Sequence, residues 1–111
     1  MISIEAFRKL ALSIPHVTEL PHFEKTSFRI NNKIFSTLDI TKNLAVVKLT
    51  QLDQSVFCEY NKEIIYPVKG AWGKQGWTAI ELKKVKKDIL SDLLITSYTL
   101  VSTPKSTKKK K

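Results

Sequence analysis

The chain of 111 residues has a single cysteine, only three glycines and no long apolar run. One cysteine, Cys58, cannot form a disulfide within the chain, and this favours a reducing compartment, the cytoplasm. No stretch approaches the roughly 18 apolar residues of a membrane-spanning helix, and the N-terminus lacks the basic-then-apolar order of a signal peptide. A domain of this length buries enough surface to fold without metal or disulfide. We therefore expect a soluble cytoplasmic monomer that needs no cofactor.

Positive charge is in excess, and much of the excess lies at the C-terminus. The chain carries 19 basic and 10 acidic residues, for a net charge of +9. Without the five lysines of the C-terminal tail, 14 basic residues remain against the same 10 acidic ones, so the body is only mildly basic. We expect residues 1–102 to form one domain and residues 103–111 a disordered basic tail. Such a tail either only keeps the protein soluble or adds a salt-sensitive attraction to a polyanion.

The hydrophobic spacing changes from helical to strand-like early in the chain. The apolar residues of IEAFRKLALSI recur at helical spacing after Ser3, which is suited to cap a helix, and Pro15 ends the pattern. From residue 26 the period is two. The segments TSFRI, IFSTLDI and LAVVKL, separated by polar turns, therefore predict three antiparallel strands.

The second half predicts a short helix, two extended segments and a longer helix. EIIYPV is a brief extended piece that its proline confines to an edge, WTAIEL is a strand, and residues of about 84–100 form the last helix. The order of the elements predicts an α+β domain, an antiparallel sheet with helices packed mainly on one face. The short helix, LDQSVFCEY, is expected to present four residues on one side: Leu52, Val56, Phe57 and Tyr60.

Alternation along the strands assigns their side chains to two faces. In WTAIEL, Ile80 and Leu82 form the better core face, so Trp77 stands on the opposite one. The same reasoning gives each strand a core face and a second face. The predicted core face consists of Phe28, Ile30, Ile34, Leu38, Ile40, Ala45, Val47, Leu49, Thr78, Ile80 and Leu82. The predicted second face carries Arg29, Phe35, Thr37, Asp39, Val46, Lys48, Trp77, Ala79 and Glu81.

The second face has two interpretations. Aromatic rings beside cations on an uncovered sheet are typical of a platform for single-stranded nucleic acid, on which bases stack while phosphates meet cations. A sheet of this size is often covered on both faces, and the short helix with Val56, Phe57 and Tyr60 would then supply the cover. The three glycines all lie within KGAWGKQGW, and in the covered arrangement they would only allow a tight turn.

Residues that could carry chemistry are few and scattered. His16 and His22, with two glutamates nearby, match neither the HExxH motif nor the spacing of a zinc finger. Cys58 has no basic neighbour in sequence that would activate its thiol. The glycines of KGAWGKQGW do not form a phosphate-binding loop, because the pattern GxxxxGK[ST] is absent. We expect neither an enzyme nor a metal-binding protein.

Four segments resemble the MmcQ/YjbR family of small bacterial proteins: SIPHVTELPHFEKTSFRINNKIFSTLD, VKLTQLDQSVF, IYPVKGAWGKQGWTAIEL and LLITSYTLV. The resemblance covers nearly all of residues 4–101. It implies a CyaY-like α+β fold with a double-wing arrangement of hairpins, and DNA binding, the activity by which the family is usually described. Frataxin-type proteins of the same fold bind iron through an acidic first helix. Here that helix has only Glu5 as an acid, beside Arg8 and Lys9, so we expect no metal.

The leading prediction is a cytoplasmic, non-catalytic module that binds nucleic acid weakly and without sequence preference. The alternative is a protein- or small-ligand-binding module that uses the same tryptophan-bearing face. In the first case the contacts come from the hairpin, the glycine–tryptophan turn and the adjoining strands. The predicted contact residues are Lys25, Arg29, Lys33, Lys48, Lys69, Trp72, Lys74 and Trp77.

Overall fold

The computed structural model describes residues 2–102, which form a six-stranded antiparallel sheet and four helices. The α+β prediction is therefore confirmed, while the predicted tail, residues 103–111, lies outside the described part of the chain. The strands are ordered β1-β2-β3-β4-β6-β5 across the sheet. In chain order the elements are α1 (Ile4–Leu12), β1 (Thr18–His22), β2 (Lys25–Ile30), β3 (Lys33–Asp39), β4 (Leu44–Lys48), α2 (Gln51–Tyr60), β5 (Ile65–Pro67), α3 (Ala71–Lys74), β6 (Trp77–Glu81) and α4 (Lys87–Ser102).

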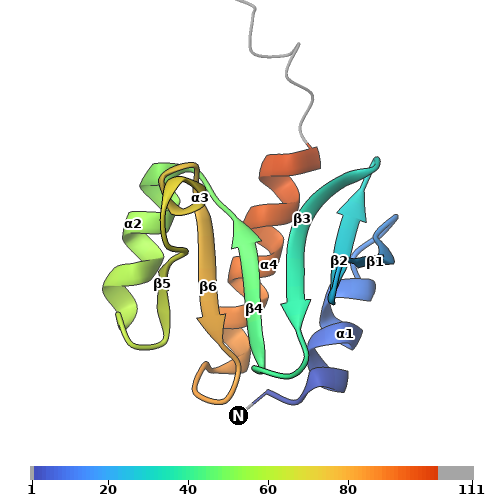
Figure 1. Cartoon of the computed structure of the whole chain (residues 1–111), viewed down its shortest axis with the longest axis horizontal. Helices are drawn as coiled ribbons and strands as arrows, with labels where there is room; N and C mark the ends of the chain where they lie inside the picture. Colours follow the sequence, from blue (N-terminus) through green and yellow to red (C-terminus); the bar gives the residue numbers. More distant parts are fainter. Residues whose placement is uncertain (1, 103–111) are drawn as a thin grey trace, which may run out of the picture.

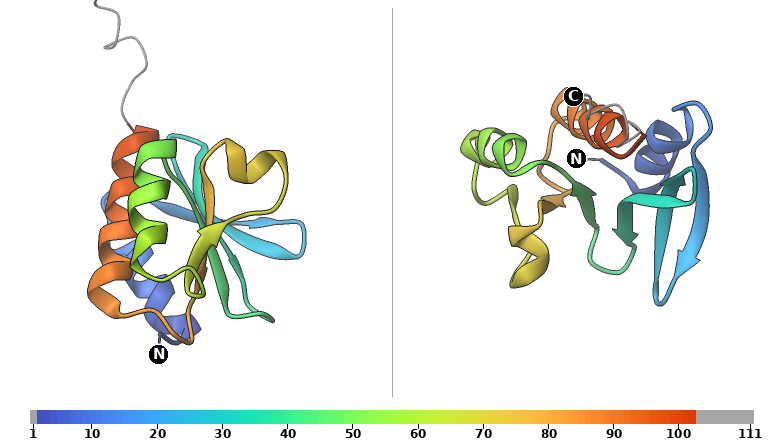
Figure 2. Two further views of the ribbon diagram at one scale, coloured as in Figure 1. Left: turned by 90° about the vertical axis from the view of Figure 1, so that its left-hand side faces the viewer. Right: turned by 90° about the horizontal axis from the view of Figure 1, so that it is seen from above.

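The helices are distributed unevenly over the two faces of the sheet (Figure 1). Seen from the side and from above, α1, α2 and α4 lie together on one side, with the buried core between them and the strands (Figure 2). The one-turn helix α3 and the hairpin of β1 and β2 project from the other side. Within residues 2–102, no helix is both long and apolar enough to cross a membrane.

Helix α1 forms where the sequence predicts it. The hydroxyl of Ser3 accepts a hydrogen bond from a backbone N–H of the first turn, at 3.0 Å, and so satisfies a donor that the helix itself leaves unpaired. Phe7 is buried against the sheet. The guanidinium of Arg8 donates twice to one carboxylate oxygen of Glu19, at 3.1 and 3.0 Å, and the hydroxyl of Thr26 donates to the other oxygen. These contacts fasten α1 to the first hairpin.

Strand β3 contains a β-bulge that changes the predicted faces. Phe28 of β2 pairs with Ser36, but the next residue, Arg29, pairs with Ile34, so Phe35 has no partner on β2. An extra residue of this kind shifts the alternation by one position. Phe35 is consequently fully buried, whereas Ile34 lies on the face away from the helices. The predictions that Phe35 points outward and that Ile34 points inward are both wrong.

Ser97 of α4 stabilises this bulge from the core side. Its buried hydroxyl donates to the carbonyl oxygen of Phe35 at 2.8 Å and accepts from the backbone N–H of Lys48 at 3.1 Å. The hydroxyl thus supplies a donor and an acceptor to two backbone groups at the point where the pairing is irregular. Ile40, predicted to be in the core, lies beyond the end of β3 and is exposed.

Helix α2 is rotated relative to the prediction. Of the four residues predicted on one side of α2, Leu52, Val56 and Tyr60 are exposed, with the fractional exposure of Leu52 at 74%, and only Phe57 packs against the core. Cys58 is buried, and Gln54 points its amide toward the loop around α3 and the start of β6. Because α2 lies on the same side as α1 and α4 (Figure 2), it leaves the second face of the sheet uncovered.

Two elements were not predicted from the sequence. Strand β1 occupies a segment for which the sequence predicted neither a helix nor a strand, and it extends the sheet by pairing with β2 from Thr18 to His22. Helix α3, a single turn, occupies part of the segment read only as a turn. The last helix begins at Lys87 and not near residue 84, and Val85, which precedes it, is buried.

Candidate binding groove on the open sheet face

One row of side chains crosses all six strands on the side away from α1, α2 and α4. The strand register pairs neighbours in this row at every step, and paired residues of adjacent strands face the same way. We call this surface the open face. The row runs through Leu20, Ser27, Thr37, Val46, Ala79 and Tyr66.

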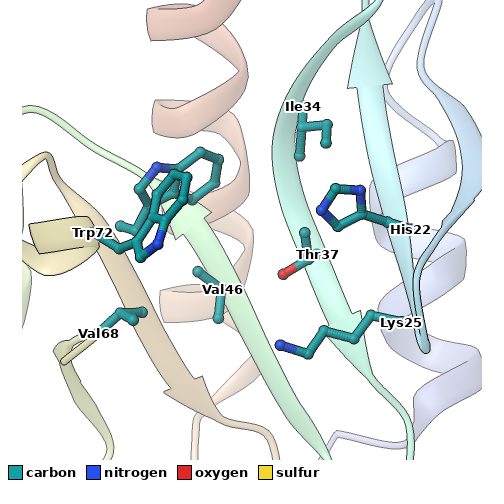
Figure 3. A pocket seen from close by; sticks show the side chains of 8 residues that line it. His22, Lys25, Ile34, Thr37, Val46, Val68 and Trp72 are labelled. Atoms are coloured by element: carbon teal, nitrogen blue, oxygen red, sulfur yellow. The ribbon is translucent and has the colours of Figure 1, made fainter. Parts of the chain in front are cut away.

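A pocket of about 320 Å³ lies on the open face. The side chains of β3, β4 and β6 form its floor, the end of the β1–β2 hairpin contributes one wall, and the segment around α3 contributes the other (Figure 3). Its volume is at the small end of the range for ligand sites, and its lining combines apolar groups with a few polar ones. The lining residues are His22, Lys25, Ile34, Thr37, Val46, Val68, Trp72 and Trp77.

Both tryptophans of the chain belong to this pocket. Trp72 projects from α3 with 61% of its surface exposed, and its ring meets that of Trp77 edge to face, with the centroids 6.3 Å apart. Trp77 is half-buried in β6. The ammonium of Lys48, from the neighbouring strand, lies 5.3 Å from the centroid of the Trp77 ring, within the range of a cation–π contact.

The glycines beside the tryptophans allow close backbone approach. A Cβ added to Gly73 would lie 1.8 Å from the carbonyl oxygen of Val68, and one added to Gly76 would lie 1.8 Å from that of Leu49. Gly76 also has φ of 107°, which favours glycine. Gly73 and Gly76 therefore fix the path of the chain between Trp72 and Trp77, and the two tryptophans line the pocket.

A glutamine of α2 holds this loop from the helix side. The amide nitrogen of Gln54 lies 3.0 Å from the carbonyl oxygen of Gly73, 3.3 Å from that of Trp77 and 3.1 Å from the hydroxyl of Thr78. The amide of Gln51 donates to a further carbonyl at the end of α3, at 2.8 Å. Helix α2 thus positions α3, and Trp72 with it, from the opposite side of the sheet edge.

Two acidic side chains on the open face are already engaged. The hydroxyl of Tyr66 donates to Glu81, and this hydrogen bond is the main cause that raises the pKa of Tyr66 to about 12. Asp39 accepts from the hydroxyl of Thr41 at 2.8 Å, which is the main cause that lowers the pKa of Asp39 below its ordinary value. Both carboxylates are therefore held within the fold, and the charge of Lys25 also acts on Asp39.

A family model for YjbR proteins matches residues 12–100. The chain belongs to the YjbR family. The resemblance seen in the sequence is therefore confirmed, and the match includes every strand and all the residues that line the pocket.

A solved structure shares the fold of this YjbR-family chain. Protein DR2400 of Deinococcus radiodurans, which carries a DUF419 domain, superimposes with a TM-score of 0.82 at 22% sequence identity. The alignment covers 96% of this chain and 85% of that one. No curated protein matches the chain.

The structure of this YjbR-family chain brings together five of the eight predicted contact residues. Lys25, Trp72 and Trp77 line the pocket, Lys48 lies over the Trp77 ring, and Arg29 is on the same face, where it donates to the hydroxyl of Ser27. The other three are exposed: Lys69 lies in the link before α3, Lys74 is the last residue of α3, and Lys33 is the first residue of β3. Lys33 pairs with buried Ile30 and is therefore directed to the helix side, away from the open face.

The prediction missed His22, Ile34 and Val68, which also line the pocket. His22 belongs to β1, a strand that the polar sequence TELPH with its internal proline does not indicate. Ile34 reaches the pocket only because of the bulge at Phe35. Val68 lies in the short link between β5 and α3, for which no periodic pattern exists.

The candidate metal and nucleophile residues lie in different parts of the fold. His16 is exposed with φ of 69°, whereas His22 lines the pocket. Among residues 2–102 no group of three or more histidine, cysteine or acidic side chains is placed to hold a metal ion. Burial raises the pKa of the Cys58 thiol, which works against a reactive thiolate.

Proposed function

We propose that this YjbR-family protein is a nucleic-acid-binding module without catalytic activity, and that the open face is its contact surface. The observation that carries the proposal is the pair Trp72 and Trp77 on an uncovered sheet face, with Lys48 over the ring of Trp77. Exposed indoles are costly to leave in water and are enriched where a flat or apolar partner docks.

The charge around the groove supports an anionic partner. Five of the six predicted basic contact residues lie on or beside the open face. Glu24, Asp39 and Glu81 are acidic residues there, and the last two are hydrogen-bonded within the fold. Aromatic rings that stack with bases, beside lysines that meet phosphates, are the combination by which sheet surfaces bind single strands. These basic residues are Lys25, Arg29, Lys48, Lys69 and Lys74, whereas Lys33 is directed to the helix-covered side.

The expected affinity is modest. The cations are dispersed around the groove and not concentrated in one cluster, so binding through phosphates should be roughly 10⁻⁴ to 10⁻⁶ M at physiological salt and should not depend on sequence. The affinity should fall as salt rises, because each phosphate contact releases counterions.

Fluorescence anisotropy of labelled oligonucleotides at about 50 and 200 mM salt tests the proposal. We expect saturable binding at the lower salt that weakens by at least tenfold at the higher. The variant Trp72→Ala should reduce the affinity about 5- to 100-fold, as loss of one stacking contact does. Val56→Ala is the matched control, because Val56 is equally exposed at 61% but lies on the helix-covered side. Lack of binding at low salt overturns the proposal, as does an equal effect of the two variants.

The apolar part of the pocket favours a second candidate, a module that binds a protein segment or a small apolar ligand. Ile34, Val46 and Val68 contribute much of the lining between the two walls. Such a ligand would bind with an affinity that changes little between the two salt concentrations, and Lys48→Gln would leave it unaffected. Salt dependence therefore separates the two candidates in one experiment.

A further inference from the structure

Phe23 is the most exposed large apolar side chain of the described residues. It lies in the two-residue turn between β1 and β2, and 94% of its surface is exposed. Its backbone has φ of 59°, a left-handed conformation that bulky residues rarely adopt. A phenylalanine gains no burial there and adds backbone strain, so the fold itself does not account for it.

The position of Phe23 connects it to the pocket. It directly follows His22, which lines the pocket, and the two rings meet edge to face with centroids 4.9 Å apart. Lys25, two residues further on, also lines the pocket. The hairpin projects from the same side of the sheet as α3 (Figure 2). Trp72 therefore stands on one wall of the groove, and Phe23 lies just outside the other wall, at the tip of the hairpin, where it borders a second depression with Leu20 and Ile40.

We infer that Phe23 is a second base-stacking contact and that the groove is selective for single-stranded over double-stranded nucleic acid. The inference rests on the proposed function and adds the class of ligand. A single strand that crosses the groove from α3 to the hairpin places one base against the indoles in the pocket and a later base against Phe23, while its phosphates meet the lysines on the way.

The geometry explains why a duplex is the poorer ligand. Paired bases are stacked on one another and present only their edges in the grooves, so their faces are not available to protein rings. Trp77, on β6, belongs to the floor between the projecting walls. A duplex that rests on the walls would contact the protein mainly through phosphates, and the rings of Trp72 and Phe23 would meet its backbone and not the faces of its bases. Its binding would use the lysines but not the rings.

The test compares a single-stranded oligonucleotide of about 12 nucleotides with a duplex of the same length, within the ~4–16 nucleotides that one small single-strand-binding fold covers. A third ligand is the same single strand with abasic sites, which keeps the phosphates and removes the bases. Phe23→Ala, Phe23→Trp and Leu52→Ala are compared with the parent chain. Leu52 is the matched control, since it is also strongly exposed but lies on α2 at the helix-covered side.

We expect the parent chain to bind the single strand at least fivefold more tightly than the duplex. Phe23→Ala should lower single-strand affinity about 5- to 100-fold, leave duplex and abasic binding within twofold, and leave the thermal midpoint unchanged. Phe23→Trp should restore the affinity, and Leu52→Ala should change nothing. Equal binding of both forms, or a Phe23→Ala variant that binds like the parent, overturns this inference and leaves the proposed function standing. Failure of every oligonucleotide to bind overturns both.

Discussion

The ammonium of Lys48 lies 5.3 Å from the ring centroid of Trp77, and the two residues are direct partners in the β4–β6 pairing. The strand register therefore brings cation and ring together before any ligand arrives. A nucleotide whose base stacks on the pocket indoles could therefore place its phosphate near the ammonium of Lys48. The pair is consequently the most direct link between the fold and the proposed function.

Lys48→Gln should change the salt dependence of binding as well as its strength. Loss of one phosphate contact reduces the slope of log K against log salt by about 0.7 for a single strand. Lys87→Gln removes the same charge from α4, on the covered side, and should leave the slope unchanged. Titrations at four or more salt concentrations measure both slopes; a Lys48→Gln slope equal to that of the parent would show that this lysine meets no phosphate.

Ser97→Ala should destabilise the fold by about 1–3 kcal/mol, because it leaves the carbonyl of Phe35 and the N–H of Lys48 buried without their partner. Urea denaturation measures the loss. Ser55→Ala, at an exposed position of α2, should stay within about 0.5 kcal/mol of the parent. Equal stabilities of the two variants would mean that the hydroxyl of Ser97 does not stabilise the bulge.

Gly76→Ala should be more destabilising than Gly70→Ala. Both residues have positive φ, which makes alanine strained at each, at a cost of about 1–3 kcal/mol. Only at Gly76 would the new Cβ also collide with a backbone carbonyl, that of Leu49, whereas nothing lies within 4 Å at Gly70. Thermal or urea denaturation of the two variants ranks them. The reverse ranking would show that the chain path around Trp77 is not set by this contact.

Tyr66 should be the last tyrosine to ionise. Its pKa is raised to about 12 by the hydrogen bond to Glu81. Because the folded pKa exceeds the ordinary value of about 10, the stabilisation from this bond is fully present below pH ~10 and is lost as the pH rises toward ~12. Absorbance titration of tyrosinate should show a late step that Tyr66→Phe removes and Tyr60→Phe keeps. Its persistence in Tyr66→Phe would contradict the assignment.

Local sequence patterns were sufficient to predict an element and its buried face where that element packs on the core with regular spacing. The helix after Ser3 and its cap follow from spacing and residue type, and the alternation of β6 places Trp77 on the face opposite Ile80 correctly. The sequence thus predicted which residues of β6 lie on the open face, but not that this face is uncovered. What alternation cannot show is whether a helix covers that face, because this depends on where the helix packs.

The errors arise where a distant contact decides the local structure. The bulge at Phe35 is stabilised by Ser97, a residue 62 positions away, so no pattern within β3 indicates it. Helix α2 shows the same effect. Its apolar spacing predicted one side formed by Leu52, Val56, Phe57 and Tyr60. Phe57 and Cys58 instead pack toward the core, Leu52 and Val56 are exposed, and the amide of Gln54 is hydrogen-bonded to carbonyl groups of the α3–β6 segment.

The central claim is that nucleic acid binds against the two indoles of the open face, and intrinsic tryptophan fluorescence tests it most directly because Trp72 and Trp77 are the only tryptophans. An unlabelled single-stranded oligonucleotide, titrated at about 50 mM salt, should quench the emission in a saturable way. The quenching should be reversed by raising the salt and reduced in Trp72→Phe. Emission that stays constant while anisotropy reports a bound oligonucleotide would place the binding elsewhere and contradict the account.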